Sequence, residues 1–187
     1  PTLSSLAKIT SRQRAARAGE SGGSQLVTLS APRSPATEAY RVLRTSIQLD
    51  SINKPIKSVL ITSSTRAEGK SLTAANLAVV MAQGGFRTIL VDADLRKPFQ
   101  HHLFGFEKND VGLTNGLLKQ GAIDEFARPT KVENLRLLMT GPLPPDPAET
   151  LGSERMKTFK ARLEAQADML IFDSPPCLAV ADTSVLA

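Results

Sequence analysis

Residues 64–71 read Ser-Thr-Arg-Ala-Glu-Gly-Lys-Ser, and this stretch decides the fold because of what lies on either side of it. The apolar run Val59-Leu60-Ile61 precedes it, and a stretch of helical character, residues 70–83, follows it. In a loop between a strand and a helix, backbone N–H groups and the positive end of the helix dipole point at an anion. The stretch therefore predicts a phosphate-binding loop.

Each position of this loop has an expected task if the phosphate belongs to ATP or ADP with Mg²⁺. Lys70 is expected to reach the β- and γ-phosphates, and the Ser71 hydroxyl to ligate Mg²⁺. The common pattern begins with glycine where this chain has Ser64, and Ala67 stands where a related pattern has glycine, although alanine tolerates a positive φ poorly. A chance Gly-Lys-Ser before a helix is the alternative interpretation. The predicted nucleotide-binding residues are Ser64, Thr65, Arg66, Ala67, Glu68, Gly69, Lys70, Ser71 and Leu72.

Acidic residues follow two further apolar runs. Asp92 and Asp94 come after Ile89-Leu90-Val91, and Asp173 comes after Met169-Leu170-Ile171-Phe172. Neighbouring carboxylates repel unless a cation or proton lies between them, and a metal–nucleotide site supplies that cation. One carboxylate can then hold metal-bound water while another accepts a proton from an incoming hydroxyl. A solvated turn rich in aspartate is the competing interpretation. The predicted catalytic residues are Lys70, Asp92 and Asp94, and the predicted metal ligands are Ser71, Asp94 and Asp173.

The apolar runs alternate with helical stretches along the chain. A fourth candidate strand is Leu135–Met139, and further helices are expected at about 112–120 and 153–166. Continuous apolar runs are typical of parallel strands that are buried on both faces. We therefore predict an α/β fold, a three-layer, mostly parallel sheet of the P-loop NTPase type with helices on both faces. Ligands of such sheets bind at the carboxyl ends of the strands, where the polar residues fall.

Another helix is expected to begin at Pro35, with Ser34 as its N-cap, and to end before Pro55. Its predicted buried stripe is Tyr40, Leu43 and Ile47. Three charged residues lie on another face, each three positions from the next: Glu38, Arg41 and Arg44. That face is either solvated or used for docking, and the spacing alone leaves both interpretations open.

Composition places the chain among ordinary globular proteins. It has 187 residues, of which 41% are hydrophobic and 22% charged, so it suits one domain and excludes a wholly disordered or collagen-like chain. The single cysteine, Cys177, indicates a reducing compartment.

Residues 1–30 are predicted to be a basic flexible segment, and residues 31–187 the folded domain. A contact of that segment with anionic lipid or nucleic acid is the weaker alternative, since no aromatic residues stand among its basic ones; no nucleic acid is expected as a partner.

Five motifs occur together in one order. They are Glu38-Ala39-Tyr40-Arg41-Val42-Leu43-Arg44-Thr45, Glu68-Gly69-Lys70-Ser71, Val91-Asp92-Ala93-Asp94-Leu95-Arg96-Lys97-Pro98, Gly141-Pro142-Leu143-Pro144-Pro145 and Phe172-Asp173-Ser174-Pro175-Pro176. As a set they resemble the cytoplasmic kinase domain of the bacterial tyrosine kinases (BY-kinases) of capsule and exopolysaccharide synthesis. The resemblance covers about residues 30–187.

This resemblance implies an ATP- and Mg²⁺-dependent protein-tyrosine kinase. Lys70 and Ser71 match the family's Walker A motif, Asp92 and Asp94 its second acidic motif, and Asp173 its Walker B motif. Glu38, Arg41 and Arg44 match a Glu-x-x-Arg-x-x-Arg motif whose helix docks on a neighbouring subunit and builds a ring. The ring feeds a tyrosine-rich C-terminal tail to the next subunit, so that autophosphorylation occurs in trans.

The resemblance also implies partners and a place in the cell. The expected partner is a transmembrane polysaccharide co-polymerase or activator, separate or fused, and the expected location is cytoplasmic, at the inner face of the bacterial membrane. There the kinase would regulate polysaccharide polymerisation and export. Two departures stand out: Arg66 and Ala67 replace the usual Pro-Gly, and Tyr40 is the only tyrosine. Without the tail and the last strands of the sheet, the domain is expected to be C-terminally incomplete.

Two other functions compete with the kinase. A positioning or partitioning ATPase of the same superclass carries a signature lysine early in the loop, where this chain has Thr65. A nucleotide-gated scaffold without catalysis would not need the full set of acidic residues and Lys70. Both features favour the kinase.

Overall fold

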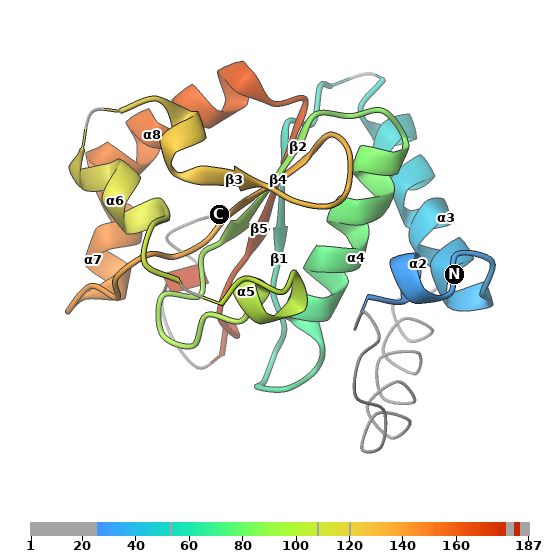
Figure 1. Ribbon diagram of the computed structural model, residues 1–187, viewed down its shortest axis with the longest axis horizontal. Helices are drawn as coiled ribbons and strands as arrows, with labels where there is room; N and C mark the ends of the chain where they lie inside the picture. Colours follow the sequence, from blue (N-terminus) through green and yellow to red (C-terminus); the bar gives the residue numbers. More distant parts are fainter. Residues whose placement is uncertain (1–25, 53, 108, 120, 179–181, 184–187) are drawn as a thin grey trace.

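Five strands form one sheet in the order β1-β5-β2-β4-β3 (Figure 1). The computed structural model describes residues 26–52, 54–107, 109–119, 121–178 and 182–183. The strands are β1 (Ser58–Ile61), β2 (Thr88–Asp92), β3 (Ala127–Pro129), β4 (Leu135–Leu138) and β5 (Met169–Asp173). All neighbouring strands pair in parallel except β3, which is antiparallel to β4. The predicted, mostly parallel sheet is confirmed, and so are all four predicted strands.

The two central strands explain why their sequences are uninterrupted apolar runs. Every residue of β2 and β5 is buried. Alternate side chains enter opposite faces: Leu90 and Ile171 join the core under one helical layer, while Val91 and Phe172 join the core on the other side. Because both faces are covered, polar residues in these strands are confined to their ends: Thr88 at the start of β2, and Asp92 and Asp173 at the last positions.

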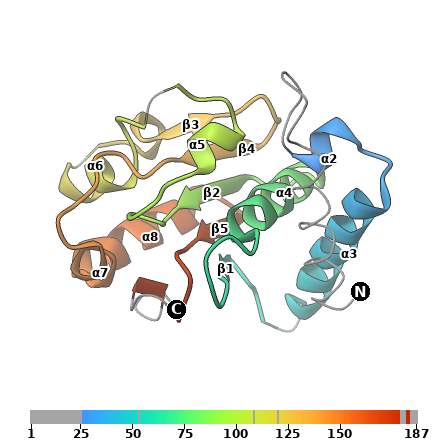
Figure 2. The same ribbon diagram turned by 90° about the horizontal axis from the view of Figure 1, so that it is seen from below.

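Helices cover both faces of the sheet, as Figure 2 shows. On one face lies α4 (Lys70–Gln83), with α3 (Pro35–Asp50) and α2 (Val27–Ser30) packed against it. The other face carries α6 (Leu113–Leu118), α7 (Pro147–Gly152) and α8 (Glu154–Gln166). Two short elements, α5 (Gln100–Leu103) and the 3₁₀ turn η1 (Ile123–Glu125), lie in the connections. The predicted layering is confirmed, and no helix in the described part of the chain has the length and hydropathy to cross a bilayer.

Helix α3 forms as its sequence predicts. The Ser34 hydroxyl accepts a hydrogen bond from the backbone N–H of Thr37 at 3.2 Å, and Pro35 occupies the first turn. Tyr40 is fully buried, and Leu43 and Ile47 pack half-buried against the same core. The predicted apolar stripe therefore faces α4.

The structure differs from expectation at three places. Residues 26–30 were assigned to the flexible segment, but Val27–Ser30 form α2, its N-cap Leu26 is buried, and Thr28 hydrogen-bonds Asn76 of α4. Residues 1–25 lie outside the described part. Strand β3 was not expected, because it has only three residues and ends in Pro129. Helix α7 was also not expected; Asp146 caps it and Pro147 opens it, although prolines there suggested only a rigid loop.

The cap of α3 gives a test of this description. Replacing Ser34 by alanine removes the acceptor for the Thr37 N–H, so the free energy of unfolding should fall by about 1 kcal/mol. Ser46 is a matched control, since it is exposed in the same helix and bonds only the Val42 carbonyl; Ser46→Ala should change stability by less than about 0.5 kcal/mol. Urea denaturation measures both, and equal losses in the two variants would contradict the capping role.

Candidate active site

Three neighbouring strands end at one edge of the sheet and bring the predicted site residues together. Asp92 of β2 pairs in register with Asp173 of β5, and Ile61 of β1 pairs with Asp173 from the other side. The predicted phosphate-binding loop, residues 64–71, lies in the connection from β1 and runs into the first turn of α4. The predicted loop, the acidic pair and the third aspartate therefore form one site at the carboxyl edge of the sheet.

The loop itself contains a left-handed turn that its sequence does not favour. Ala67 has φ of 67° and Gly69 has φ of 92°. Glycine adopts such angles freely, whereas a residue with a Cβ pays about 1–2 kcal/mol. Position 67, where a related pattern has glycine, thus adopts a glycine-like conformation, and this chain meets it with a strained alanine.

The Glu68 carboxylate accepts hydrogen bonds from three donors of this loop. Its Oε2 accepts from the backbone N–H groups of Ser64 and Thr65, at 3.0 and 3.2 Å, and its Oε1 accepts from the Thr65 hydroxyl at 3.0 Å. The bonds from Thr65 and Ser64 lower the pKa of the Glu68 carboxyl. Two backbone donors near the start of the loop thus already converge on a negatively charged group, which sequence reasoning did not foresee.

Lys70 lies among the carboxylates. Its Nζ is 2.8 Å from Oδ2 of Asp94 and 3.7 Å from Oδ1 of Asp173, and it donates to the Ser71 hydroxyl at 3.2 Å. Burial acts to lower the pKa of Lys70, but the charges of Asp173 and Asp94 outweigh burial and raise it. The ammonium group is therefore held charged, and the structure brings Lys70, Ser71, Asp94 and Asp173 together as the sequence predicted.

Asp92 has a different environment from Asp94. It is fully buried; its Oδ2 accepts from the backbone N–H groups of Phe99 and Gln100, both at 3.0 Å. Burial, followed by the charge of Asp173, raises the pKa of Asp92 well above its usual value. Asp92 thus orders the turn that follows β2, and Asp94 is the residue of the pair that contacts Lys70.

Nothing in the sequence indicated that Gln100 and Asp182 lie close to the predicted site residues. Gln100 is buried at the start of α5, and its Nε2 donates to Oδ2 of Asp173 at 2.8 Å. Arg96 makes a two-point ion pair with the buried Asp182, at 2.8 and 3.0 Å. Neither Gln100 nor Asp182 belongs to a motif of phosphate-binding loops. In a helix as short as α5, the periodicity of the sequence does not distinguish a buried glutamine from an exposed one.

The donor set fits a metal ion that arrives with a nucleotide. Oδ1 of Asp173 is buried and makes no hydrogen bond within the described residues, and the Ser71 hydroxyl belongs to the same group of side chains. Within that part of the chain, no three His, Cys, Asp or Glu side chains gather closely enough to hold an ion by themselves. Mg²⁺ is usually bound by one or two carboxylates together with substrate phosphates and water, rather than by an all-protein cage.

The charged face of α3 is only partly as expected. Glu38 and Arg41 form an exposed ion pair at 3.1 Å. Arg44 instead lies half-buried, and its Nη1 donates at 2.9 Å to the carbonyl oxygen of Val80 near the end of α4. The same carbonyl also accepts from the N–H of the C-cap residue Gly84 at 3.1 Å, so Arg44 supplies a second donor at the C-terminal end of α4. Arg44 thus joins α3 to α4, and Glu38 and Arg41 remain on the exposed face.

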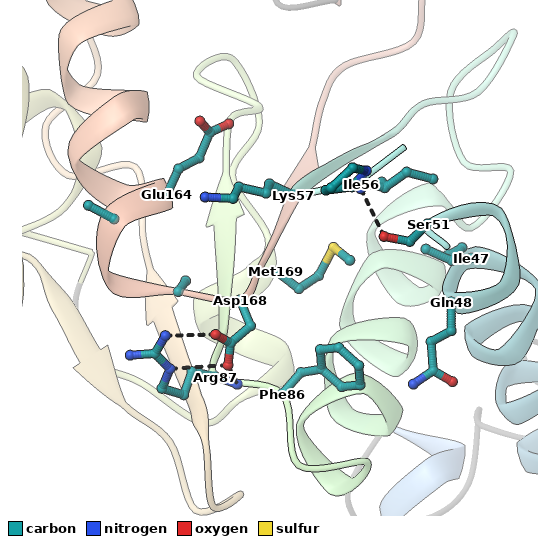
Figure 3. Close-up of a pocket in the computed structure, with 13 residues that line it drawn as sticks. Ile47, Gln48, Ser51, Ile56, Lys57, Phe86, Arg87, Glu164, Asp168 and Met169 are labelled. Atoms are coloured by element: carbon teal, nitrogen blue, oxygen red, sulfur yellow. Dashed lines mark hydrogen bonds and ion pairs between the residues drawn. The ribbon is translucent and has the colours of Figure 1, made fainter. Parts of the chain in front are cut away.

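A cavity of about 350 Å³ lies at the opposite end of the strands, between α3 and α8 (Figure 3). Phe86, Lys57 and Met169 line it, and at its edge Arg87 pairs with Asp168 at 2.7 Å. None of the predicted site residues borders this cavity. The candidate active site is therefore the open edge around the loop, not this cavity.

Comparison with known proteins identifies the family of the chain. An AAA domain family model matches residues 57–187. The chain is 47% identical over 161 residues to the tyrosine-protein kinase YwqD of Bacillus subtilis, covering 86% of this chain and 68% of that protein. It is 36% identical to the tyrosine-protein kinase wzc of Salmonella typhi, covering 87% of this chain but only 22% of that longer protein.

Solved structures show the same relationship. The chimerical protein CapA2B2 superposes with a TM-score of 0.82 at 35% identity, over 88% of this chain and 72% of that one. The kinase domain of the Escherichia coli tyrosine kinase ETK gives 0.80 at 31% identity, over 86% and 62%. The cell division ATPase MinD of Pyrococcus furiosus, at 24% identity and a TM-score of 0.57, shares the fold alone. The relatives YwqD, wzc and ETK are tyrosine-protein kinases, and the chain belongs to the family of bacterial tyrosine-protein kinases, enzymes built here on a P-loop fold.

Proposed function

We propose that the site at the ends of β1, β5 and β2 transfers the γ-phosphoryl group of Mg²⁺-ATP to a tyrosine hydroxyl. The observation that carries this proposal is the ammonium group of Lys70, placed next to the phosphate-binding loop and paired with Asp94 and Asp173. A charged lysine in that position is ready to exchange a carboxylate partner for phosphate oxygens. Phosphoryl transfer depends mainly on positioning and on stabilising the negative charge of the transferred group.

The loop and Lys70 have to change partners when a nucleotide binds. The N–H groups of Ser64 and Thr65 release the Glu68 carboxylate, and Lys70 releases Asp94. Mg²⁺, when bound, neutralises charge on the phosphate oxygens, and Ser71, Asp94 and Asp173 would hold it. Asp94 and Asp92 are the carboxylates available to take the tyrosine proton, and Asp92 has to give up backbone hydrogen bonds to do so.

The acceptor and the setting follow from the family resemblance. The proposed acceptor is a tyrosine-rich tail of a neighbouring copy, because Tyr40 is buried in α3 and is the only tyrosine of this chain. The proposed setting is the cytoplasmic face of the bacterial membrane, beside a transmembrane polysaccharide co-polymerase or activator. There the kinase regulates capsule or exopolysaccharide polymerisation and export.

Lys70→Met tests the proposed chemistry. It removes the positive charge that stabilises the transferred phosphoryl group, so transfer of radiolabelled phosphate to a tyrosine-containing peptide should fall at least about 100-fold. Lys57→Met is the matched control, since Lys57 lies at the opposite end of the strands and should leave transfer unchanged. Phosphate release without phosphotyrosine in the wild type would instead favour a positioning ATPase, and nucleotide binding without turnover would favour a scaffold.

The two aspartates after β2 can be separated by Asp92→Asn and Asp94→Asn. If Asp92 accepts the tyrosine proton, Asp92→Asn should slow single-turnover phosphorylation by roughly 100-fold or more, with ADP affinity kept within about threefold. Asp94→Asn should in addition weaken the Mg²⁺ dependence of ADP binding, because Asp94 is a predicted ligand. Near-normal single-turnover phosphorylation in Asp92→Asn would reduce Asp92 to its structural task at the turn.

Assembly into a ring is the remaining part of the proposal, and α3 supplies its test. An exposed ion pair contributes about 0–1 kcal/mol, so Glu38→Ala with Arg41→Ala should leave the fold intact while lowering the oligomer mass in light scattering. Arg44→Ala should lower the free energy of unfolding by about 1.5–3 kcal/mol, because a charged hydrogen bond to α4 is lost. Identical masses for the wild type and the double variant would return Glu38 and Arg41 to a solvated face.

A further inference from the structure

Gln100 connects the three elements that carry the site. It is the first residue of α5, it has no exposed surface, and α5 packs beside α4 (Figure 1). Its side-chain Nε2 donates to Oδ2 of Asp173 at 2.8 Å and to the carbonyl oxygen of Ser71 at 2.9 Å. Its backbone N–H donates to Oδ2 of Asp92 at 3.0 Å. One residue thus bonds the end of β5, the first turn of α4 and the end of β2.

The orientation of the Gln100 amide follows from its partners. Both groups that contact Nε2 are pure acceptors, a carboxylate and a carbonyl, so the nitrogen must face them. The opposite atom, Oε1, is buried and has no hydrogen-bond partner within the described residues. A buried acceptor without a partner is destabilising, so packing alone does not favour glutamine at this position.

The hydrogen bond from Gln100 divides the two oxygens of Asp173 between two tasks. Oδ2 is held by Gln100, whereas Oδ1 has no hydrogen-bond partner within the described residues and lies 3.7 Å from the Nζ of Lys70; the Ser71 side chain also acts on this carboxylate. A carboxylate that is anchored through one oxygen cannot rotate freely, so its other oxygen stays on the side of Lys70. The second bond of Nε2 ties the same amide to the backbone of Ser71, another of the predicted metal ligands, in the first turn of α4.

We propose that Gln100 is a positioning residue of this kinase, which aligns Asp173 with Ser71 for the metal–nucleotide complex. It acts through these two residues and not on the substrate, and the proposal rests on the proposed use of Mg²⁺-nucleotide at this site. Groups that hydrogen-bond metal ligands orient those ligands, and their loss commonly reduces metal affinity by about 10–100-fold. The free Oε1 is then an acceptor for a hydrogen bond that only the occupied site supplies.

The test measures how strongly Mg²⁺ improves ADP binding, by calorimetry with Mg²⁺ and with EDTA. Gln100→Met keeps a side chain of similar length but removes both N–H donors. Its ADP affinity in EDTA should stay within about threefold of the wild type, while the improvement due to Mg²⁺ should fall about tenfold. Gln100→Asn keeps an amide of shorter reach and should show a smaller loss in the same direction, which covers the case that the Met variant does not fold.

Thr28→Val is the matched control for lost stability. It removes a buried side-chain hydrogen bond to Asn76, on the side of α4 that faces α2, without changing side-chain shape much. It should keep the full improvement by Mg²⁺. An unchanged improvement in Gln100→Met, or an equal loss in Thr28→Val, would overturn the positioning role. A wild type that binds ADP equally with and without Mg²⁺ would instead overturn the proposed metal–nucleotide function, and the positioning role with it.

Discussion

The charge of Lys70 is the constraint on which the site depends. Asp94 and Asp173 lie almost entirely out of water, and a buried carboxylate without a counter-charge is strongly destabilising. The ammonium group between them compensates for that cost, and it can do so only because α4 begins directly at Lys70. The placement of α4 in turn depends on the sheet register that sets β1 beside β5. The charge balance of the site and the position of α4 therefore both depend on Lys70.

Much of the fold is readable from the sequence because its strongest signals are local. Strands such as β2 and β5 are buried on both faces and appear as unbroken apolar runs, and the Ser-Pro start of α3 encodes its own cap. The elements that were missed obey other rules. The strand β3 exists only because β4 offers it an edge, and α2 is held by a hydrogen bond to α4, 48 residues away in the chain.

Some residues of the candidate site could likewise be predicted from the sequence, and others could not. Lys70 and the strand-end aspartates could be predicted, since parallel strands deliver their last residues to a common edge. The roles of Gln100 and Glu68 could not, because each depends on how a turn folds back on its neighbours. Arg44 shows the limit most clearly: its spacing placed it with Glu38 and Arg41, but the length of its side chain allows it to reach a carbonyl on another helix.

Arg44 joins α3 to α4 through one hydrogen bond. Its guanidinium bonds the C-terminal end of the helix that begins at Lys70, while the neighbouring Glu38 and Arg41 face outward. A displacement of α4 at the loop would therefore also affect the hydrogen bond that joins α4 to α3. Thermodynamic coupling of this kind is reciprocal. A neighbouring subunit that binds α3 more tightly in one position of α4 would change the nucleotide affinity of the site. The nucleotide would change the affinity of that subunit for α3 by the same factor.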